Sequence, residues 1–255
     1  MLKHRVIPAL LLLNGGLVKT TRFKDPSYVG DPLNAIRIFN EREVDELMVI
    51  DIAASRQSSD PDYALIEQLA GECFMPLAYG GGVRNVSQAR QLFSLGVEKV
   101  CLQTAVLKNP RLVSELANQF GSQSVMVSVD VKKNFLGKTK LYHSASGRLM
   151  DDAWIDVMRD LVLAGAGEVL LNSVDKDGTL AGPDLSLIEE ASSQIDVPLI
   201  ALGGVSSLSD IKACVDAGAS AVAAGSFFVF HGPHRAVLIT YPEYRDLEKI
   251  FETDL

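Results

Sequence analysis

Glycine-rich segments followed by a hydroxyl residue are the groups in this chain best suited to hold an anion. A glycine pair at the end of a strand lets backbone amides approach an anion closely, and the next strand supplies the hydroxyl. In the second half of the chain the set comprises Gly203, Gly204, Gly225, Ser226, Asp177 and Gly178. The last two follow another expected strand, from which they close the site. The pattern predicts a phosphate site, and glycines needed only for tight turns are the alternative.

The first half of the chain repeats this pattern. Residues separated by 122 positions correspond in five pairs: Gly81 and Gly203, Gly82 and Gly204, Gly96 and Gly218, Thr104 and Ser226, and Glu46 and Glu168. A second phosphate site at Gly81, Gly82 and Thr104 is therefore expected, with turn formation again the alternative. Two such sites fit a long ligand that is phosphorylated at both ends. The repeat also indicates a duplicated half-barrel.

Four charged residues come at the starts of expected strands, at the end of the molecule opposite the glycine pairs. They are Arg5, Glu46, Lys99 and Glu168. Because side chains alternate along a strand, Arg5 shares the face of Leu11 and Lys99 shares that of Gln103, which directs both inward. The four formal charges sum to zero, so the groups can pair instead of remaining isolated. An ion-pair layer that simply closes a barrel is one explanation.

These residues must be positioned by short apolar runs that alternate with amphipathic ones. The expected strands are Val6–Leu12, Leu47–Ile52, Pro76–Tyr79, Lys99–Gln103, Val125–Asp130, Val169–Ser173, Pro198–Leu202 and Ala221–Ala224. The expected helices are Pro32–Arg42, Tyr63–Cys73, Val86–Leu95, Leu112–Phe120, Trp154–Ala164, Leu185–Ser193 and Asp210–Ala217.

Eight buried strands separated by helices favour an α/β fold, a single (β/α)₈ TIM barrel that occupies residues 1–255. The two half-barrels are expected at about 1–122 and 123–255. A doubly wound open sheet is the rival, but no GxGxxG turn follows the first strand.

Two segments, 14–31 and 131–150, are longer than ordinary connections and follow the first and fifth expected strands. We expect both at the C-terminal mouth of the barrel, where active-site loops belong. A small hairpin is expected at Phe135–Tyr142. Disordered surface loops are the alternative for segments of this length.

Charge and cysteine usage narrow the classes of partner. The 255 residues carry 24 basic and 32 acidic side chains, a formal charge of −8, which disfavours nucleic acid and anionic membranes as partners. The apolar run Val6–Leu13 is far too short to span a bilayer. Cys73, Cys101 and Cys214 are widely spaced, which indicates reduced core residues of a cytoplasmic protein with neither a metal site nor a disulfide framework. No cofactor is expected.

Over essentially its whole length, the sequence resembles the cyclase (HisF-type) subunit of imidazole glycerol phosphate synthase. The matching stretches are Gly30–Pro32, Asp45–Leu47, Asp51–Ser55, Gly80–Gly82, Phe120–Gln123, Gly165–Glu168 and Asp175–Thr179. The resemblance implies a (β/α)₈ barrel with a glutaminase (HisH-type) subunit docked on its N-terminal face. Ammonia released there crosses the barrel to a bisphosphorylated substrate at the mouth, where cyclisation and cleavage follow.

The family's chemistry uses two aspartates as acid and base, at the ends of the first and fifth strands. The resemblance assigns Asp130 to the second position, whereas Leu11 occupies the first. Leucine transfers no proton, and acid–base assistance contributes roughly 10²–10⁴-fold, so the histidine-pathway reaction is expected to be impaired. Lys19 and Asp51 are expected to support the mouth, with a loop lysine and an amide-capping aspartate as the structural alternatives.

In the family, the positions of Arg5, Glu46, Lys99 and Glu168 form a salt-bridge gate between the glutaminase and the barrel interior, and all four match. The chain therefore combines an intact ammonia entrance with a broken acid–base pair. The segments Leu11–Thr20 and Phe230–Pro242 resemble diverged paralogues in surface-polysaccharide (O-antigen) pathways, which are associated with nucleotide-sugar amidation.

This resemblance predicts an ammonia-conducting subunit that works with a glutaminase and a separate sugar amidotransferase. Two alternatives stay open. One is an authentic cyclase subunit in which another group replaces the lost aspartate. The other is a scaffold that binds a phosphorylated metabolite without catalysis.

Overall fold

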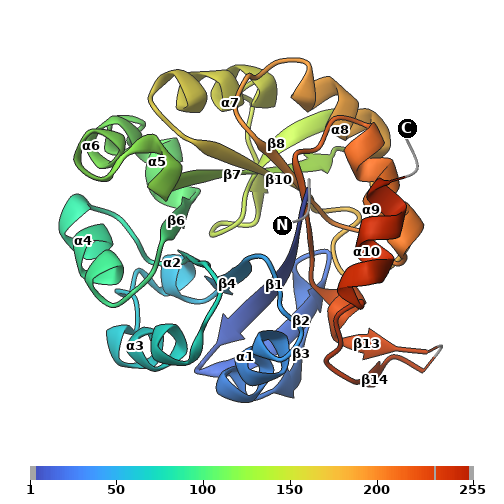
Figure 1. Ribbon diagram of the computed structural model, residues 1–255. Helices are drawn as coiled ribbons and strands as arrows, with labels where there is room; N and C mark the ends of the chain where they lie inside the picture. Colours follow the sequence, from blue (N-terminus) through green and yellow to red (C-terminus); the bar gives the residue numbers. More distant parts are fainter. Residues whose placement is uncertain (1–3, 233, 253–255) are drawn as a thin grey trace.

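The fold is a closed ring of eight parallel strands surrounded by helices (Figure 1). The computed structural model describes residues 4–232 and 234–252. The ring strands, in chain order, are β1 (Arg5–Leu13), β4 (Leu47–Asp51), β5 (Leu77–Gly80), β6 (Lys99–Leu102), β7 (Val125–Lys133), β10 (Glu168–Ser173), β11 (Leu199–Leu202) and β12 (Ala221–Ala224). Each strand pairs with the next, and β12 pairs with β1 to close the ring. The predicted (β/α)₈ barrel is thus confirmed.

The expected helices form, with ends within two residues of the predicted bounds. They are α1 (Pro32–Asn40), α3 (Tyr63–Glu72), α4 (Val86–Ser94), α6 (Arg111–Phe120), α7 (Trp154–Leu163), α8 (Leu185–Ser192) and α9 (Leu208–Asp216). N-terminal caps explain where α1, α3 and α8 begin. The carboxylates of Asp31, Asp62 and Asp184 each accept a hydrogen bond from the backbone amide three residues later in the sequence.

Among the described residues, three α-helices lie outside the sequence prediction. They are α2 (Ala54–Gln57), α5 (Thr104–Lys108) and α10 (Tyr244–Phe251). The first two are too short to show a helical period. Short 3₁₀ turns occupy η1 (Ser122–Ser124) and η2 (Ser226–Phe228). In the described part of the chain, no helix combines the length and apolar character that a bilayer crossing requires.

Apolar side chains fill two separate layers, as strand alternation requires. The outer layer lies between the strands and the helices. The inner layer fills the barrel and contains Ile7, Ala9, Met48, Ala78, Cys101, Met126, Leu170, Ile200, Ala221 and Ala223. Four of these ten inner residues are alanine, so the interior of the barrel is apolar and lined in large part by small side chains.

The two long segments at the mouth are built as β-hairpins. The first forms β2 (Gly16–Thr21) and β3 (Lys24–Gly30), and β2 pairs antiparallel with the end of β1. The second prolongs β7, which pairs with β8 (Thr139–His143), followed by β9 (Arg148–Leu149). The hairpin therefore starts earlier than the expected Phe135–Tyr142, because its first strand is the continuation of β7 and its turn lies at 134–138.

Equivalent positions of the sequence repeat adopt equivalent backbone geometry. Asn85 has φ −155° and ψ 167°, and Ser207, 122 residues later, has φ −152° and ψ 165°. Gly96 and Gly218 have φ values of 100° and 101°. These agreements support the half-barrel interpretation, which stays a proposal about the origin of the fold.

A small antiparallel ribbon follows β12 in the described part of the chain. It consists of β13 (Phe230–His231) and β14 (Ala236–Val237). Arg235, in the connection between the two strands, donates a 2.7 Å hydrogen bond to the carbonyl of Gly178, which ties the ribbon to the loop after β10.

Candidate functional site

The mouth of the barrel holds a cavity that collects most of the predicted site residues. Its lining includes Leu11, Lys19, Asp51, Gly81, Gly82, Thr104, Asp130, Asp177, Gly225 and Ser226. Gly178, Gly203 and Gly204 are not among its lining residues, and Gly203 lines a separate small cavity beside α8. The structure thus brings together the first-half phosphate set but only part of the second-half set.

Asp130, on β7, is the central carboxylate of this cavity. Its two oxygens accept hydrogen bonds from the Ser128 hydroxyl at 2.8 Å and the Gln103 amide at 2.9 Å. The residue is only 5% exposed, and burial raises the pKa of the Asp130 carboxyl to about 6. A carboxyl with this pKa exchanges protons near neutral pH, as acid–base catalysis requires.

Lys19 reaches into the same cavity from β2, where its ammonium donates a hydrogen bond to the carbonyl of Ala9. Burial lowers the pKa of Lys19 to about 8, and the nearby charge of Asp177 partly opposes that shift. The conformation needs Gly225, since a Cβ at that position would lie 2.6 Å from the Lys19 Nζ. Gly225 therefore has a packing role in addition to the phosphate role predicted for it.

Asp177 faces the cavity from the loop after β10. Although the residue keeps some exposed surface, burial of its carboxyl raises the pKa to about 6, against the opposing charge of Lys19. The Thr20 hydroxyl donates to it at 3.4 Å. The mouth thus contains two carboxyls that titrate near neutral pH, Asp130 and Asp177, and one buried amine.

Leu11 ends the inward-facing row of β1. It pairs with Val18 on β2 and Ile50 on β4 and lines the cavity that contains Asp130. A hydrocarbon side chain therefore stands where β1 meets the mouth.

The first-half glycines lie against the end of β4. Asp51 accepts hydrogen bonds from the backbone amides of Ala53 and Ala54, at 2.8 and 3.0 Å. It therefore caps this turn, which is the structural role that the sequence analysis gave as the alternative to a supporting role at the mouth. A Cβ on Gly81 would lie 2.5 Å from the Asp51 carbonyl oxygen, which shows that close backbone packing requires this glycine. Arg56, an exposed cation on α2, joins Gly81, Gly82 and Thr104 in the cavity lining.

The residues of the predicted second-half phosphate site have two different surroundings, since some are closely packed against the backbone and others line the cavity. A Cβ on Gly178 would lie 2.0 Å from the Thr20 carbonyl oxygen, and one on Gly204 would lie 2.3 Å from that of Gly182. By contrast, Ser226 and Asn172 line the cavity, and their buried Oγ and Oδ1 atoms have no hydrogen-bond partner among the described residues. Buried polar atoms of this kind favour a ligand with complementary groups.

The polar lining residues that the sequence analysis did not select as site residues include Gln103, Ser144 and Asn172. Gln103 links Asp130 to the carbonyl of Tyr142, at 2.8 Å, and Ser144 donates to the Gln103 side-chain oxygen at 2.5 Å. Gln103 was detectable as the neighbour of Thr104 and the repeat partner of Gly225. No sequence signal identified Ser144 or Asn172, because a hairpin and a strand register bring them to the mouth.

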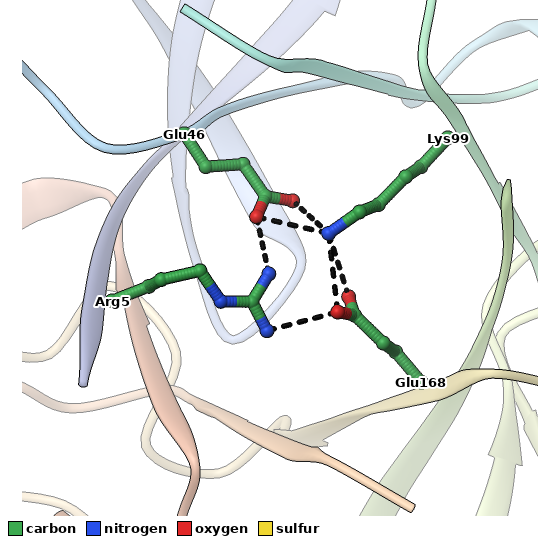
Figure 2. A network of polar contacts seen from close by, with 4 residues as sticks. All are labelled: Arg5, Glu46, Lys99 and Glu168. Carbon is green, nitrogen blue, oxygen red and sulfur yellow. Dashed lines mark hydrogen bonds and ion pairs between the residues drawn. The ribbon is translucent and has the colours of Figure 1, made fainter. Parts of the chain in front are cut away.

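At the opposite end of the barrel, four charged side chains meet on the axis (Figure 2). The Arg5 guanidinium bonds to Glu46 and, at 2.9 Å, to Glu168. The Lys99 ammonium lies 3.0 Å from both Glu46 oxygens and 3.1 Å from both Glu168 oxygens. Each cation thus contacts both carboxylates, and the Glu46 side chain is only 2% exposed. We call Arg5, Glu46, Lys99 and Glu168 the entrance ring.

The inner apolar layer lies between the entrance ring and the mouth cavity. On β1, Ile7 and Ala9 lie in that layer between Arg5 and Leu11. Leu11 lies six residue steps beyond Arg5, which is about 20 Å along the strand. A layer of apolar side chains thus separates the ion-pair ring from the mouth cavity.

Comparison with known proteins decides the family. A family model described as "Histidine biosynthesis protein" matches residues 5–234. The chain belongs to this histidine biosynthesis family. Its relatives include the Pseudomonas aeruginosa protein named "Putative imidazole glycerol phosphate synthase subunit hisF2", 51% identical over 97% of this chain and 99% of that protein.

Two further relatives carry the same kind of name. The Leptospira interrogans HisF subunit is 47% identical over 98% of this chain and 100% of its own length. The Vibrio vulnificus hisF3 subunit is 46% identical over 99% of this chain and 98% of its own length. The resemblance to HisF-type subunits is therefore confirmed, and the names hisF2 and hisF3 are consistent with a diverged HisF paralogue.

Proposed function

We propose that this HisF-type chain conducts ammonia from a glutaminase partner through its barrel to a separate protein that carries out an amidation. One observation carries the proposal. The entrance ring is complete, while the mouth cavity has the hydrocarbon side chain of Leu11 at the end of β1 and the carboxylate of Asp130 on β7. In this account the entrance has been kept and the acid–base pair of the cyclase has been lost.

The interior supports passage of the neutral molecule. Ammonium pays a large desolvation cost in an apolar passage, whereas neutral ammonia does not. Four of the inner-layer side chains are the small methyl groups of Ala9, Ala78, Ala221 and Ala223, which occupy little of the barrel interior. The ring is the gate, because Arg5 or Lys99 must exchange partners to let a molecule pass.

We place the glutaminase on the N-terminal face, against the entrance ring, and the acceptor protein at the mouth. The acceptor is a sugar amidotransferase of surface-polysaccharide (O-antigen) synthesis, as the resemblance of Leu11–Thr20 and Phe230–Pro242 suggests. The mouth also binds a phosphorylated small molecule. Arg56, Gly82 and Thr104 support one phosphate site, and the unpartnered Ser226 hydroxyl supports the other. The free thiols of Cys73, Cys101 and Cys214 support a cytoplasmic location.

The test is to combine the purified chain with its glutaminase and to follow two products. We expect glutamine hydrolysis with little imidazole glycerol phosphate. Imidazole glycerol phosphate formation at a rate close to that of a histidine-pathway cyclase subunit overturns the proposal. The variant Arg5→Ala is expected to reduce the transfer of ammonia, and undiminished transfer favours a phosphometabolite-binding scaffold instead.

A second candidate is an authentic cyclase subunit in histidine biosynthesis, and Asp177 favours it. This carboxyl titrates near pH 6, lies beside the Lys19 amine and shares the cavity with Asp130, so it is placed to substitute for the missing acid or base. Under this alternative, Asp177→Asn abolishes imidazole glycerol phosphate formation and Leu11→Asp changes nothing.

A further inference from the structure

The β7–β8 hairpin displays an apolar tip at the mouth of the barrel. Phe135 is 95% exposed and Leu136 is 66% exposed, and they are adjacent in the turn. Large side chains displayed side by side cost free energy in water unless another surface covers them. We call residues 132–140 the mouth hairpin.

The turn is well formed. The Asn134 side-chain oxygen accepts hydrogen bonds from the amides of Leu136 and Lys138, both at 3.0 Å, and the Asn134 amide bonds to the Lys138 carbonyl at 2.9 Å. The two apolar side chains are thus held on an ordered backbone, which lowers the entropy cost of binding.

The charge of the mouth hairpin is opposite to that of the molecule. It contains Lys132, Lys133, Lys138 and Lys140 in a chain of net charge −8. Lys133 pairs with Asp184 at 3.1 Å, and Lys140 lies 3.9 Å from Asp151. Among the described residues, no carboxylate lies within 4.0 Å of the ammonium of Lys132 or Lys138. Lys138 is exposed without an ion-pair partner, and the Lys132 ammonium lies 5.4 Å from the centre of the Tyr142 ring, so the hairpin keeps a net positive charge close to its apolar tip.

The root of the same hairpin forms part of the site. Asp130 stands on β7, Ser144 follows β8, and the Lys133 amide donates a 2.7 Å hydrogen bond to Asp175 in the loop that carries Asp177. A protein bound to the tip is consequently seated beside the opening of the cavity.

From these observations we infer that the mouth hairpin is the docking site of the ammonia-accepting protein, which offers an apolar pocket with an acidic rim. The inference rests on the proposed function, since only a conduit needs a receiver at its mouth. Opposite charges accelerate the encounter, and burial of Phe135 and Leu136 holds the complex together. A receiver fixed there limits the escape of ammonia into water.

The experiment measures coupling, defined as amidated product formed per glutamine hydrolysed, in a mixture of the full chain, its glutaminase and the purified sugar amidotransferase that accepts its ammonia. The test variant is Phe135→Ser with Leu136→Ser. The control is Gln68→Ser, which changes an exposed side chain in the middle of α3, away from both ends of the barrel. Amidation driven by added ammonium chloride checks the acceptor itself.

We expect the tip variant to lower coupling about tenfold while glutamine hydrolysis and ammonium-driven amidation stay unchanged. Lys132→Glu with Lys138→Glu lowers coupling as well, and added salt weakens the wild-type coupling. Coupling by the tip variant equal to that of the wild type overturns the docking inference and leaves the proposed function standing. Absence of coupling in the wild type overturns the proposed function and this inference with it.

Two other partners of the mouth hairpin, a membrane and a second copy of this chain, are distinguished by separate measurements. Binding of the chain to phosphatidylcholine–phosphatidylglycerol vesicles, lost in the tip variant, assigns the hairpin to a membrane and overturns the inference. A dimer in sedimentation that disappears in the tip variant does the same in favour of a second copy of this chain.

Discussion

The side chains at the mouth are charged groups held where charge is costly. Asp130, Asp177 and Lys19 all have pKa values displaced by burial toward neutrality, the two carboxyls to about 6 and the amine to about 8. Such displacement costs stability, and proteins usually retain it where function benefits. The mouth therefore holds groups that can exchange protons near neutral pH, even though Leu11 contributes none.

Asp130→Asn should make the protein more stable at neutral pH. The folded carboxyl binds its proton with a pKa of about 6, against an ordinary value of 3.8. Between these values the folded state carries more protons than the unfolded state, so the free energy of unfolding falls as pH rises from 4 to 6. The amide removes this fall and raises stability at pH 7 by about 1–3 kcal/mol, reduced in part by a poorer acceptor for Gln103.

Urea unfolding of both proteins between pH 4 and pH 8 checks this expectation. Asp152→Asn, at an exposed position, is the matched control and should leave the curve unchanged. A variant at Asp130 that is less stable than the wild type at pH 7 contradicts the claim that the carboxylate is buried at a cost.

Gly225→Ala should release Lys19 from the cavity. The added methyl carbon would lie 2.6 Å from the Lys19 Nζ, and the flexible end of the lysine moves more easily than the backbone. We expect the pKa of Lys19 to rise from about 8 toward its ordinary 10.5 as the ammonium regains water.

A lysine NMR titration of Lys19 measures this directly. Gly71→Ala, where the new methyl meets nothing within 4 Å, is the control and should leave the Lys19 pKa at its wild-type value. An unchanged Lys19 pKa in the Gly225→Ala protein would show that the glycine does not hold the lysine in place.

Some of these residues were predictable from the sequence and others were not. The glycine repeat identified positions that need glycine, yet Gly225 makes room for Lys19 and Gly178 for the Thr20 carbonyl, reasons that depend on contacts between distant segments. Asn172 becomes notable only because its buried side-chain oxygen has no partner among the described residues, whereas the repeat already predicted Ser226.

At the scale of elements, the barrel strands carry the entrance ring on rigid supports. Arg5, Lys99 and Glu168 are the first residues of β1, β6 and β10, and Glu46 immediately precedes β4. Strands β1, β6 and β10 are not neighbours in the barrel, so Arg5, Lys99 and Glu168 come together only when the barrel closes. An intact entrance ring therefore requires a closed barrel.

Glu46→Gln should destabilise the barrel strongly. This side chain is 2% exposed and accepts from both Arg5 and Lys99, so its loss leaves two cations with a single carboxylate. We expect a loss of about 2–4 kcal/mol in the free energy of unfolding. Asp246→Asn, which breaks the exposed Lys249 pair on α10, should have little effect in the same urea titration. Equal effects of the two changes would show that the ring is merely a surface cluster.

Elements with a strong hydrophobic period were predictable, and those fixed by tertiary pairing were not. The ring strands and the long helices follow from apolar runs and amphipathic spacing. The hairpin β2–β3 lacks such a run, since most of β3 is exposed, and it forms because β2 pairs with the end of β1. The β7–β8 hairpin was placed too late in the sequence because β7 continues beyond its buried segment.

At the scale of the molecule, the two ends of the barrel differ in character. One end is closed by the neutral entrance ring, and the other opens into a cavity with Asp130, Asp177 and Lys19 on its walls. The apolar interior that joins them suits a small neutral molecule better than an ion. This asymmetry is the structural basis of the proposed ammonia conduit.

The most direct test of this account is the rate of imidazole glycerol phosphate formation by Leu11→Asp and by the wild type, each in complex with the same glutaminase. If the reaction was lost with the β1 carboxylate, the variant forms this product faster by roughly 10²–10⁴-fold, while the wild type shows little beyond glutamine hydrolysis. A wild-type rate already near normal, or a variant that gains nothing, contradicts the account.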